Sequence, residues 1–194
     1  MSEFQLYFEM GREHILDIQG YDHILFVVAL CAIYQAYEWK KVLILVTAFT
    51  VGHSLTLALA VLDIIEVNKP LIEFLIPVTI FLTAMFNVIK GDNATNHRNL
   101  HLNYLFALFF GLVHGMGFSN FLKSMLGKNS DLATQLFAFN LGLELGQVII
   151  VIATLFLGFL VTGILGSNRR DWNLVVSSAV GGVALMLMIE TRYW

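Results

Sequence analysis

The sequence predicts an all-α, polytopic transmembrane helix bundle with about six spanning helices, preceded by an amphipathic helix at the membrane surface. Of the 194 residues, 58% are hydrophobic and only 13% are charged. The mean hydropathy is +0.76, which is typical of membrane proteins and not of soluble domains. The charged residues gather between apolar runs, and most of these runs reach the roughly 20 residues that a spanning helix needs.

The first 20 residues form the predicted interfacial segment. Phe4, Tyr7, Phe8 and Ile15 fall near one helical face, while the charged residues lie mostly on the others. This pattern favours an amphipathic helix that lies on the bilayer surface. The predicted spans follow over residues 21–38, 41–62, 70–90, 101–122, 132–163 and 172–191. No polar stretch is long enough to hold a separate core, so residues 1–194 form a single transmembrane domain.

The spans differ in length and in the residues that bound them. Residues 21–38 form the shortest run, and the third run begins with Pro70, which suits the first turn of a helix. Residues 132–163 are longer than one crossing requires, so we expect this helix to tilt or to project from the membrane. Aromatic residues at the ends of the runs predict an interfacial belt; they are Tyr37, Trp39, Trp172 and Trp194.

Lysine and arginine residues in the short loops predict the orientation. Six follow the first, third and fifth spans: Lys40, Lys41, Lys90, Arg98, Arg169 and Arg170. Five lie on the other side: Arg12, Lys69, Lys123, Lys128 and Arg192. This bias predicts that both termini lie outside. The net charge of −3 offers no basic patch, so we expect the lipid bilayer and no nucleic acid as a partner.

Polar side chains recur inside the apolar runs at a common depth; they are Asp22, His23, His53, His114, Asn140 and Glu144. With a rise of 1.5 Å per residue, His53, His114 and Asn140 each lie roughly 12 to 13 Å below the outer ends of their spans. Ionisable groups at this depth are costly unless they face other helices, a cavity or a metal. Because several spans place them at one level, we expect one shared site.

Imidazole and carboxylate ligands suit divalent nickel, cobalt or zinc. The single cysteine, Cys31, lies outside the cluster, which argues against copper(I) and iron–sulfur centres. Structural interpretations remain open for single residues. A buried His53 or His114 can bond to a neighbouring carbonyl, and Asn140 can join two helices. Glu144 fits such an interpretation less well, because a carboxylate near the middle of a membrane requires a cation or a proton.

Four segments of the chain resemble the HupE/UreJ family, and its second branch in particular: Gly20-Tyr-Asp-His23, Thr50-Val-Gly-His-Ser54, Phe110-Gly-Leu-Val-His-Gly115 and Phe139-Asn-Leu-Gly-Leu-Glu-Leu-Gly-Gln147. The resemblance covers nearly the whole chain. Relatives in the first branch are regarded as nickel or cobalt permeases, which implies permease activity and a location in the bacterial inner membrane.

The family resemblance also implies a metal-handling motif in the first span. It maps onto His14, Gly20, Asp22 and His23 of this chain. His14 precedes Asp22 by eight residues, a longer separation than is usual in the family. The sequence therefore leaves open whether His14 joins the site.

The residues support two functions. The first is a divalent-metal transporter or permease. Its metal site is formed by His14, Asp22, His23, His53, His114 and Glu144. A homo-oligomer is an alternative way to complete the path of the ion across the membrane. The second is an intramembrane zinc hydrolase acting on a lipid or a membrane-linked substrate. In that case three histidines hold the zinc, Glu144 or Asp22 acts as general base, and Ser54 or Asn140 stabilises the oxyanion. The family resemblance favours the transporter.

Overall fold

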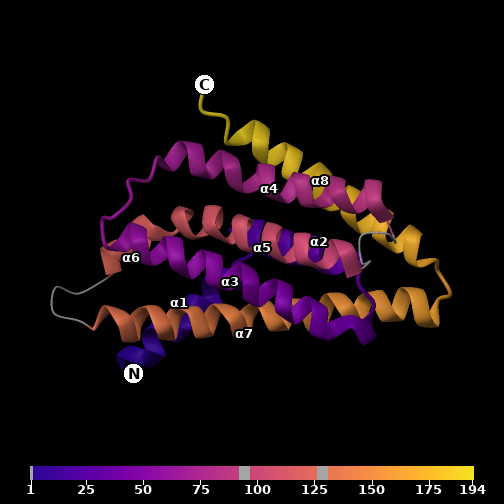
Figure 1. The fold of residues 1–194 in the computed structure, drawn as a ribbon, viewed down its shortest axis with the longest axis horizontal. Coiled ribbons are helices and arrows are strands. Elements are labelled where there is room, and N and C mark those ends of the chain that lie inside the picture. The colour runs from indigo at the N-terminus through magenta and orange to yellow at the C-terminus, as the bar shows by residue number, and fades with distance from the viewer. Residues whose placement is uncertain (1, 92–96, 126–130) are drawn as a thin grey trace.

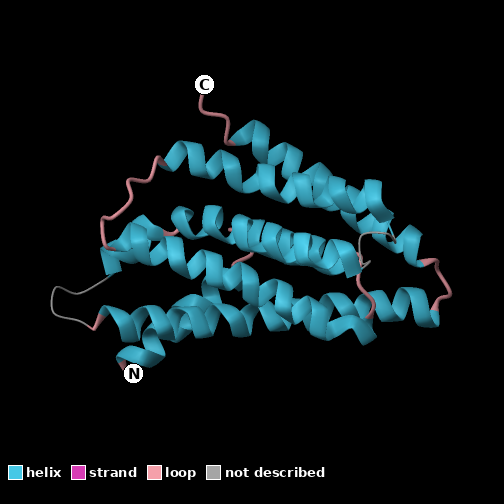
Figure 2. Ribbon diagram, viewed as in Figure 1, coloured by secondary structure: helices cyan, strands magenta, loops and turns pink. Residues whose placement is uncertain are grey.

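A computed structural model of the chain describes residues 2–91, 97–125 and 131–194, and these residues fold into helices joined by short loops (Figures 1 and 2). The predicted all-α class is confirmed. The helices are α1 (Glu3–Leu16), α2 (Asp22–Ala32), α3 (Trp39–Val61), α4 (Lys69–Lys90), α5 (His97–Gly117), α6 (Ser119–Met125), α7 (Leu132–Phe159) and α8 (Arg169–Glu190). A 3-10 turn (Ala36–Glu38) precedes α3, and a π-helical turn (Leu160–Ile164) extends α7.

Four helical stretches in the described part of the chain are long and apolar enough to cross a membrane. They are Ala36–Val61, Lys69–Lys90, Leu132–Ile164 and Arg169–Glu190. They correspond to the predicted spans 41–62, 70–90, 132–163 and 172–191. Large apolar side chains remain exposed along them, among them Ile44, Leu82, Ile152 and Val175, as expected for helices whose outward faces contact lipid.

The helices pack mainly as three pairs: α3 with α5, α1 with α7, and α4 with α8. The short helix α2 contacts α4, α7 and α8. Amide side chains contribute to this packing. The Asn173 amide of α8 donates to the Asn87 carbonyl (3.0 Å), and the Asn87 amide donates to the Ala29 carbonyl of α2 (2.7 Å). Such bonds join helices where no water is present to compete for them.

Close contact between α3 and α5 depends on glycine. A methyl group added at Gly111 or Gly115 of α5 would collide with the backbone carbonyl of Phe49 or His53 on α3. The Thr56 hydroxyl of α3 also donates to the Leu112 carbonyl of α5 at 2.7 Å. Small residues let membrane helices approach at this distance. The approach brings the His53 and His114 turns of the two helices together.

Gly111→Ala should lower the stability of the protein by about 1 to 3 kcal/mol, because the backbone of α3 would have to move away from the added methyl group. Gly182 of α8 provides a control, since a methyl group there meets no atom within 4 Å. Thermal unfolding in detergent should show a lower midpoint for Gly111→Ala and no loss for Gly182→Ala. Equal midpoints would contradict the close α3–α5 contact.

The predicted interfacial segment is α1, and its position differs from the prediction. Instead of lying free on the bilayer surface, α1 buries Tyr7, Gly11 and Ile15 and packs along α7. A methyl group at Gly11 would strike the Phe139 carbonyl, and one at Gly142 would strike the Phe8 carbonyl. Glycines on both helices therefore allow a backbone contact that the hydrophobic pattern of α1 alone does not indicate.

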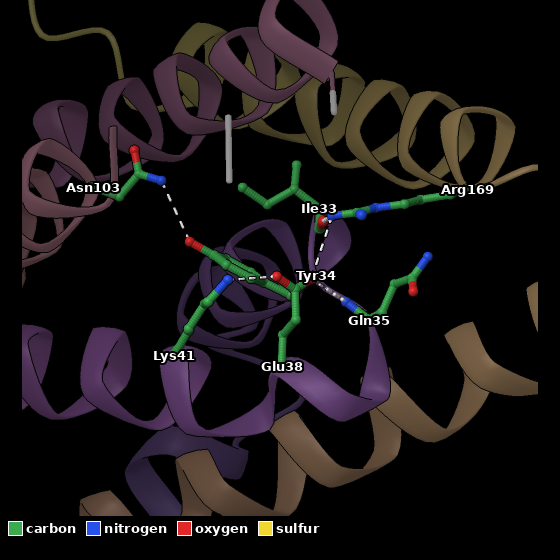
Figure 3. A network of polar contacts seen from close by, with 7 residues as sticks. All are labelled: Ile33, Tyr34, Gln35, Glu38, Lys41, Asn103 and Arg169. Atoms are coloured by element: carbon green, nitrogen blue, oxygen red, sulfur yellow. Dashed lines mark hydrogen bonds and ion pairs between the residues drawn. The ribbon is translucent and has the colours of Figure 1, made fainter. Parts of the chain in front are cut away.

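The predicted first span, 21–38, is wrong as a continuous helix, because α2 ends at Ala32. Figure 3 shows the polar contacts around the residues that follow this end. The backbone groups that this end exposes find side-chain partners. Arg169, at the start of α8, donates to the Ile33 carbonyl at 2.6 Å. The Gln35 N–H donates to the buried Glu38 carboxylate at 3.1 Å, and Lys41 pairs with Glu38 at 2.8 Å. These bonds stabilise a break within an apolar run.

The predicted span 101–122 is also interrupted. Helix α5 ends at Gly117, and α6 begins at Ser119. The Ser119 hydroxyl donates to the Met116 carbonyl at 2.8 Å, which satisfies one of the exposed carbonyls at the end of α5. Helix α6 is held in place by an ion pair between Lys123 and Asp63.

Helices α1 and α2 each cover about half the length of the bundle. Gln135, in the first turn of α7, donates to Glu3 at the start of α1, and Ile15 lies against Gly146, midway along α7. Ala29 of α2 bonds instead to Asn87 near the far end of α4. The turn between them, residues 17–21, therefore lies at half the length of the bundle.

Both termini lie at the same end of the bundle, which we call the terminal end (Figure 1). Glu3 bonds to the first turn of α7, and the Trp194 ring packs against Phe74 near the start of α4, with 5.0 Å between ring centroids. Of the residues that predict the orientation, Lys128 lies outside the described part of the chain.

Candidate metal centre

Four histidines from four helices meet where α1 ends and α2 begins. The His14 ring, in the last turn of α1, lies 4.6 Å from that of His23, in the first turn of α2. Both rings lie 6.0 Å from His53 of α3, and His23 lies 5.2 Å from His114 of α5, all measured between centroids. The sequence left the role of His14 open, and the structure brings His14 into the group.

His14, His23 and His53 each present a ring nitrogen within 4.8 Å of the other two. A metal ion about 2.1 Å from each nitrogen would hold these atoms no more than about 4.2 Å apart. Small side-chain rotations are therefore enough to close the three nitrogens around one ion. His114 lies beside His23, where it can provide a fourth nitrogen.

The ring nitrogens of the cluster are buried and have no hydrogen-bond partner within the described ranges. They are Nε2 of His14, Nε2 of His23, and both ring nitrogens of His53 and His114. His53 is fully buried and His114 is 1% exposed. A buried polar group without a partner is costly, and native proteins contain few of them. Several such nitrogens on adjacent rings form a donor set that one metal ion could satisfy.

Asp22 orients the His23 ring. The Asp22 Oδ1 atom lies 3.0 Å from His23 Nδ1, and it also accepts the His23 backbone N–H at 2.9 Å. A carboxylate on one ring nitrogen fixes the tautomer and directs the other nitrogen to a metal. Here that other nitrogen is Nε2, which has no partner. The arrangement fits a metal-binding histidine with a supporting carboxylate.

Asp22→Asn should weaken metal binding by about 10- to 100-fold, the usual effect of removing such a carboxylate. The amide keeps the size of the side chain but loses the negative charge that fixes the histidine tautomer. Competitive titration against a chelator measures the change in affinity. An unchanged dissociation constant would show that Asp22 does not support the site.

Aromatic rings form the walls of the centre. Phe118 lies 3.9 Å from His14, and Phe139 stacks near His53 at 6.4 Å. Phe26 and Phe49 lie 5.2 and 5.1 Å from His114. An apolar wall limits access of water and strengthens metal–ligand bonds. Sequence reasoning missed these rings because phenylalanine in an apolar run looks like any other lipid-facing or core residue.

A cavity of about 1070 Å³ lies beside the histidines. Its wall includes His14, His23 and His114, together with residues 17–20 of the turn between α1 and α2. Glu13, Asp17 and Glu73 add carboxylates to the wall. The histidine cluster therefore borders a wide, acidic space, and Phe118 lies on the wall of that space as well as against His14.

The remaining candidate residues lie apart from the histidine group. The Glu144 carboxylate accepts a hydrogen bond from Thr47 of α3 at 2.7 Å. The Ser54 hydroxyl donates to the Thr50 carbonyl at 2.6 Å, and the Asn140 amide donates to the Leu136 carbonyl at 2.8 Å. Among the described residues, only His14, His23 and His53 form a group of metal ligands this close. Glu144 bonds to a residue six positions before His53 on α3 and so joins a different set of contacts.

The chain matches the protein-family model described as HupE / UreJ protein over residues 1–194. The match confirms the resemblance that the sequence motifs indicate. Proteins of this family are nickel/cobalt transporter-like membrane proteins. No curated protein and no solved structure matches the chain.

Proposed function

Since the chain belongs to the HupE/UreJ family along its whole length, we propose that it binds a nickel- or cobalt-type divalent cation at the histidine cluster and transports it across the membrane. One observation supports this most: buried imidazoles without partners meet at the break between α1 and α2. His14, His23, His53 and His114 supply nitrogen ligands, and Asp22 orients His23. These neutral nitrogen donors suit nickel, cobalt and zinc.

The broken helix supports transport. Membrane transporters place substrate sites near the middle of the bilayer, where discontinuous helices expose their ends to the substrate. Here the break between α1 and α2 lies at half the length of the bundle and carries His14 and His23. The acidic wall of the cavity attracts cations towards the site. In this arrangement the cavity is the access path and the histidine cluster is the first binding site.

We also infer six crossings from this arrangement. Helices α1 and α2 together form one discontinuous crossing, and α3, α4, α5, α7 and α8 each form one more. An even number of crossings leaves both termini on one side of the membrane. The excess of lysine and arginine at the opposite end of the bundle favours the outside for the termini. The cavity then opens towards the outside.

A second candidate function is an intramembrane zinc hydrolase, and one observation favours it. Beyond the histidines the aromatic rings of Phe26 and Phe49 close the centre, which suits an ion that stays bound. A zinc ion held there would lower the pKa of a water molecule that enters from the cavity. Asp22, at the cavity wall, is the nearest carboxylate for proton transfer, whereas Glu144, Ser54 and Asn140 are engaged in contacts elsewhere.

Uptake of nickel or cobalt by proteoliposomes that contain the purified protein tests transport. We expect uptake that saturates with metal concentration and that exceeds uptake by protein-free vesicles. Zinc that copurifies, does not exchange and shows no flux would contradict transport and favour the hydrolase. Consumption of a membrane-linked substrate that stops on addition of a chelator would then identify the enzyme.

A further inference from the structure

We propose a second cation site, built from oxygen atoms, where α3 and α7 cross on the side of the histidine cluster away from the terminal end. Its residues are Thr47 and Thr50 of α3 and Glu144 and Gln147 of α7. The role of this site as the next station for a transported metal rests on the proposed function. The existence of the site does not, because binding can be measured without transport.

The four side chains form two hydrogen-bonded pairs between the helices. The Thr47 hydroxyl donates to Glu144 Oε1 at 2.7 Å, and Thr50 Oγ1 lies 2.7 Å from Gln147 Oε1. Thr50 and Thr47 precede His53 by three and six residues, which places them roughly 4.5 and 9 Å further along the axis of α3. The pairs therefore follow the metal centre in the direction of the opposite end of the bundle.

The hydrogens available to Thr50 and Gln147 do not satisfy all the polar atoms of this pair. The Thr50 hydroxyl has one hydrogen but two acceptors within reach, Gln147 Oε1 and the Val46 carbonyl at 3.1 Å. If the Gln147 amide turns by 180°, its nitrogen donates to Thr50, and Thr50 donates to Val46. The amide oxygen then takes the place of Nε2, which is buried without a partner. Gln147 is fully buried, so this oxygen requires a donor or a cation.

Glu144 adds the charge that a cation needs. Its carboxylate forms no ion pair among the described residues, and its only hydrogen bond there is the one from Thr47. A carboxylate at membrane depth is costly unless a cation or a proton compensates it. Glu144, the Gln147 amide oxygen and the two threonine hydroxyls together form a set of oxygen ligands.

Oxygen ligands differ from the histidine cluster in metal preference. Carboxylate, carbonyl and hydroxyl oxygens suit manganese and magnesium, and imidazole suits nickel, cobalt and zinc. An oxygen site would therefore hold nickel or cobalt only weakly. Weak binding is useful at a second station, because an ion must be able to leave each site along a path. The two sites can be distinguished by the metals that they prefer.

Titration with Mn²⁺, followed by electron paramagnetic resonance, tests the oxygen site in purified protein whose histidine cluster is loaded with Zn²⁺. We expect one saturable Mn²⁺ site in the wild type and at least tenfold weaker binding in Glu144→Gln. Thr154→Val is the matched control. Thr154 also lies on α7 but bonds only to its own helix, so Mn²⁺ binding should be unchanged. Equal Mn²⁺ binding by Glu144→Gln and wild type would overturn the proposal.

A second variant distinguishes loss of the cation site from loss of folding. Thr47→Val removes the hydroxyl that bonds to Glu144 and keeps the shape of the side chain, and it should weaken Mn²⁺ binding several-fold. Both variants should retain zinc at the histidines, while nickel uptake by Glu144→Gln should fall at least tenfold. Uptake equal to that of the wild type would exclude Glu144 from the path. Absence of uptake by the wild type would contradict the proposed transport and leave the Mn²⁺ result to decide the site.

Discussion

His53→Ala should empty the metal centre: the purified variant should contain less than about a tenth of the metal that the wild type holds under the same loading conditions. His53 is fully buried, and both of its ring nitrogens lack a partner. One of them lies within 4.8 Å of ligand nitrogens on His14 and His23. Its loss breaks up the one group of three nitrogens that lie this close among the described residues, which leaves too few well-placed ligands to compete with water and chelators.

Two further measurements separate loss of metal from loss of folding. A metal that binds only the folded protein raises its unfolding free energy, by about 2.7 kcal/mol when the free metal is 100 times the dissociation constant. The wild type should therefore unfold at a higher temperature with metal than without, and His53→Ala should show no such shift. His101→Ala is the control, since His101 is exposed on α5. Full occupancy in His53→Ala would contradict the assignment of the centre.

His14→Ala should reduce metal uptake by proteoliposomes to the level of vesicles without protein. His14 is the only cluster histidine supplied by α1, and its Nε2 atom is buried without a partner. Its loss removes both a ligand and the link between α1 and the ion, so the two halves of the broken helix no longer close on the same metal. A loss of one ligand from a three-nitrogen site should exceed the 10- to 100-fold effect of a supporting carboxylate.

The measurement is initial uptake of nickel, normalised to the amount of folded protein in the vesicles. His101→Ala again serves as the control and should transport at the wild-type rate. Wild-type uptake by His14→Ala would mean that α1 is only structural and that the binding site consists of His23, His53 and His114.

Long apolar runs with clear ends could be read from the sequence. Helices α3, α4, α7 and α8 begin and end within three residues of the predicted spans 41–62, 70–90 and 172–191, or within four for 132–163. Asn68 and Asp131 accept backbone hydrogen bonds at the starts of α4 and α7, a local interaction that sequence can indicate. Length and capping are local properties, so no tertiary contact is required to predict them.

The breaks in the helices could not be predicted, because the groups that stabilise them are distant in sequence. The end of α2 depends on Arg169, which bonds to Ile33 across 136 positions. The buried position of α1 depends on Gly142 of α7, which admits the backbone of Phe8. A hydropathy profile averages over a window of neighbouring residues, so it carries no information about contacts between residues that are distant in sequence.

The depth of a residue along its helix could be predicted, but the direction in which its side chain points around the helix axis could not. The rise per residue predicts that His53, His114 and Asn140 lie at one level. The histidines turn towards the break between α1 and α2, whereas Glu144 turns towards Thr47. That rotation is set by which helices pack together, and the α3–α5 and α1–α7 contacts depend on glycines whose partners lie far away in the chain. His14 reaches the histidine cluster because the helix breaks at residues 17–21. This turn accommodates the additional residues between His14 and Asp22.

X-ray absorption spectroscopy of the purified protein loaded with one equivalent of nickel or zinc tests the central claim most directly. The arrangement of His14, His23, His53 and His114 predicts at least three imidazole nitrogens at about 2.0 to 2.1 Å from the metal, with the outer-shell scattering of histidine rings. The His53→Ala protein, treated in the same way, should lose this signal. A first shell of oxygen atoms alone in the wild type would contradict a histidine metal centre.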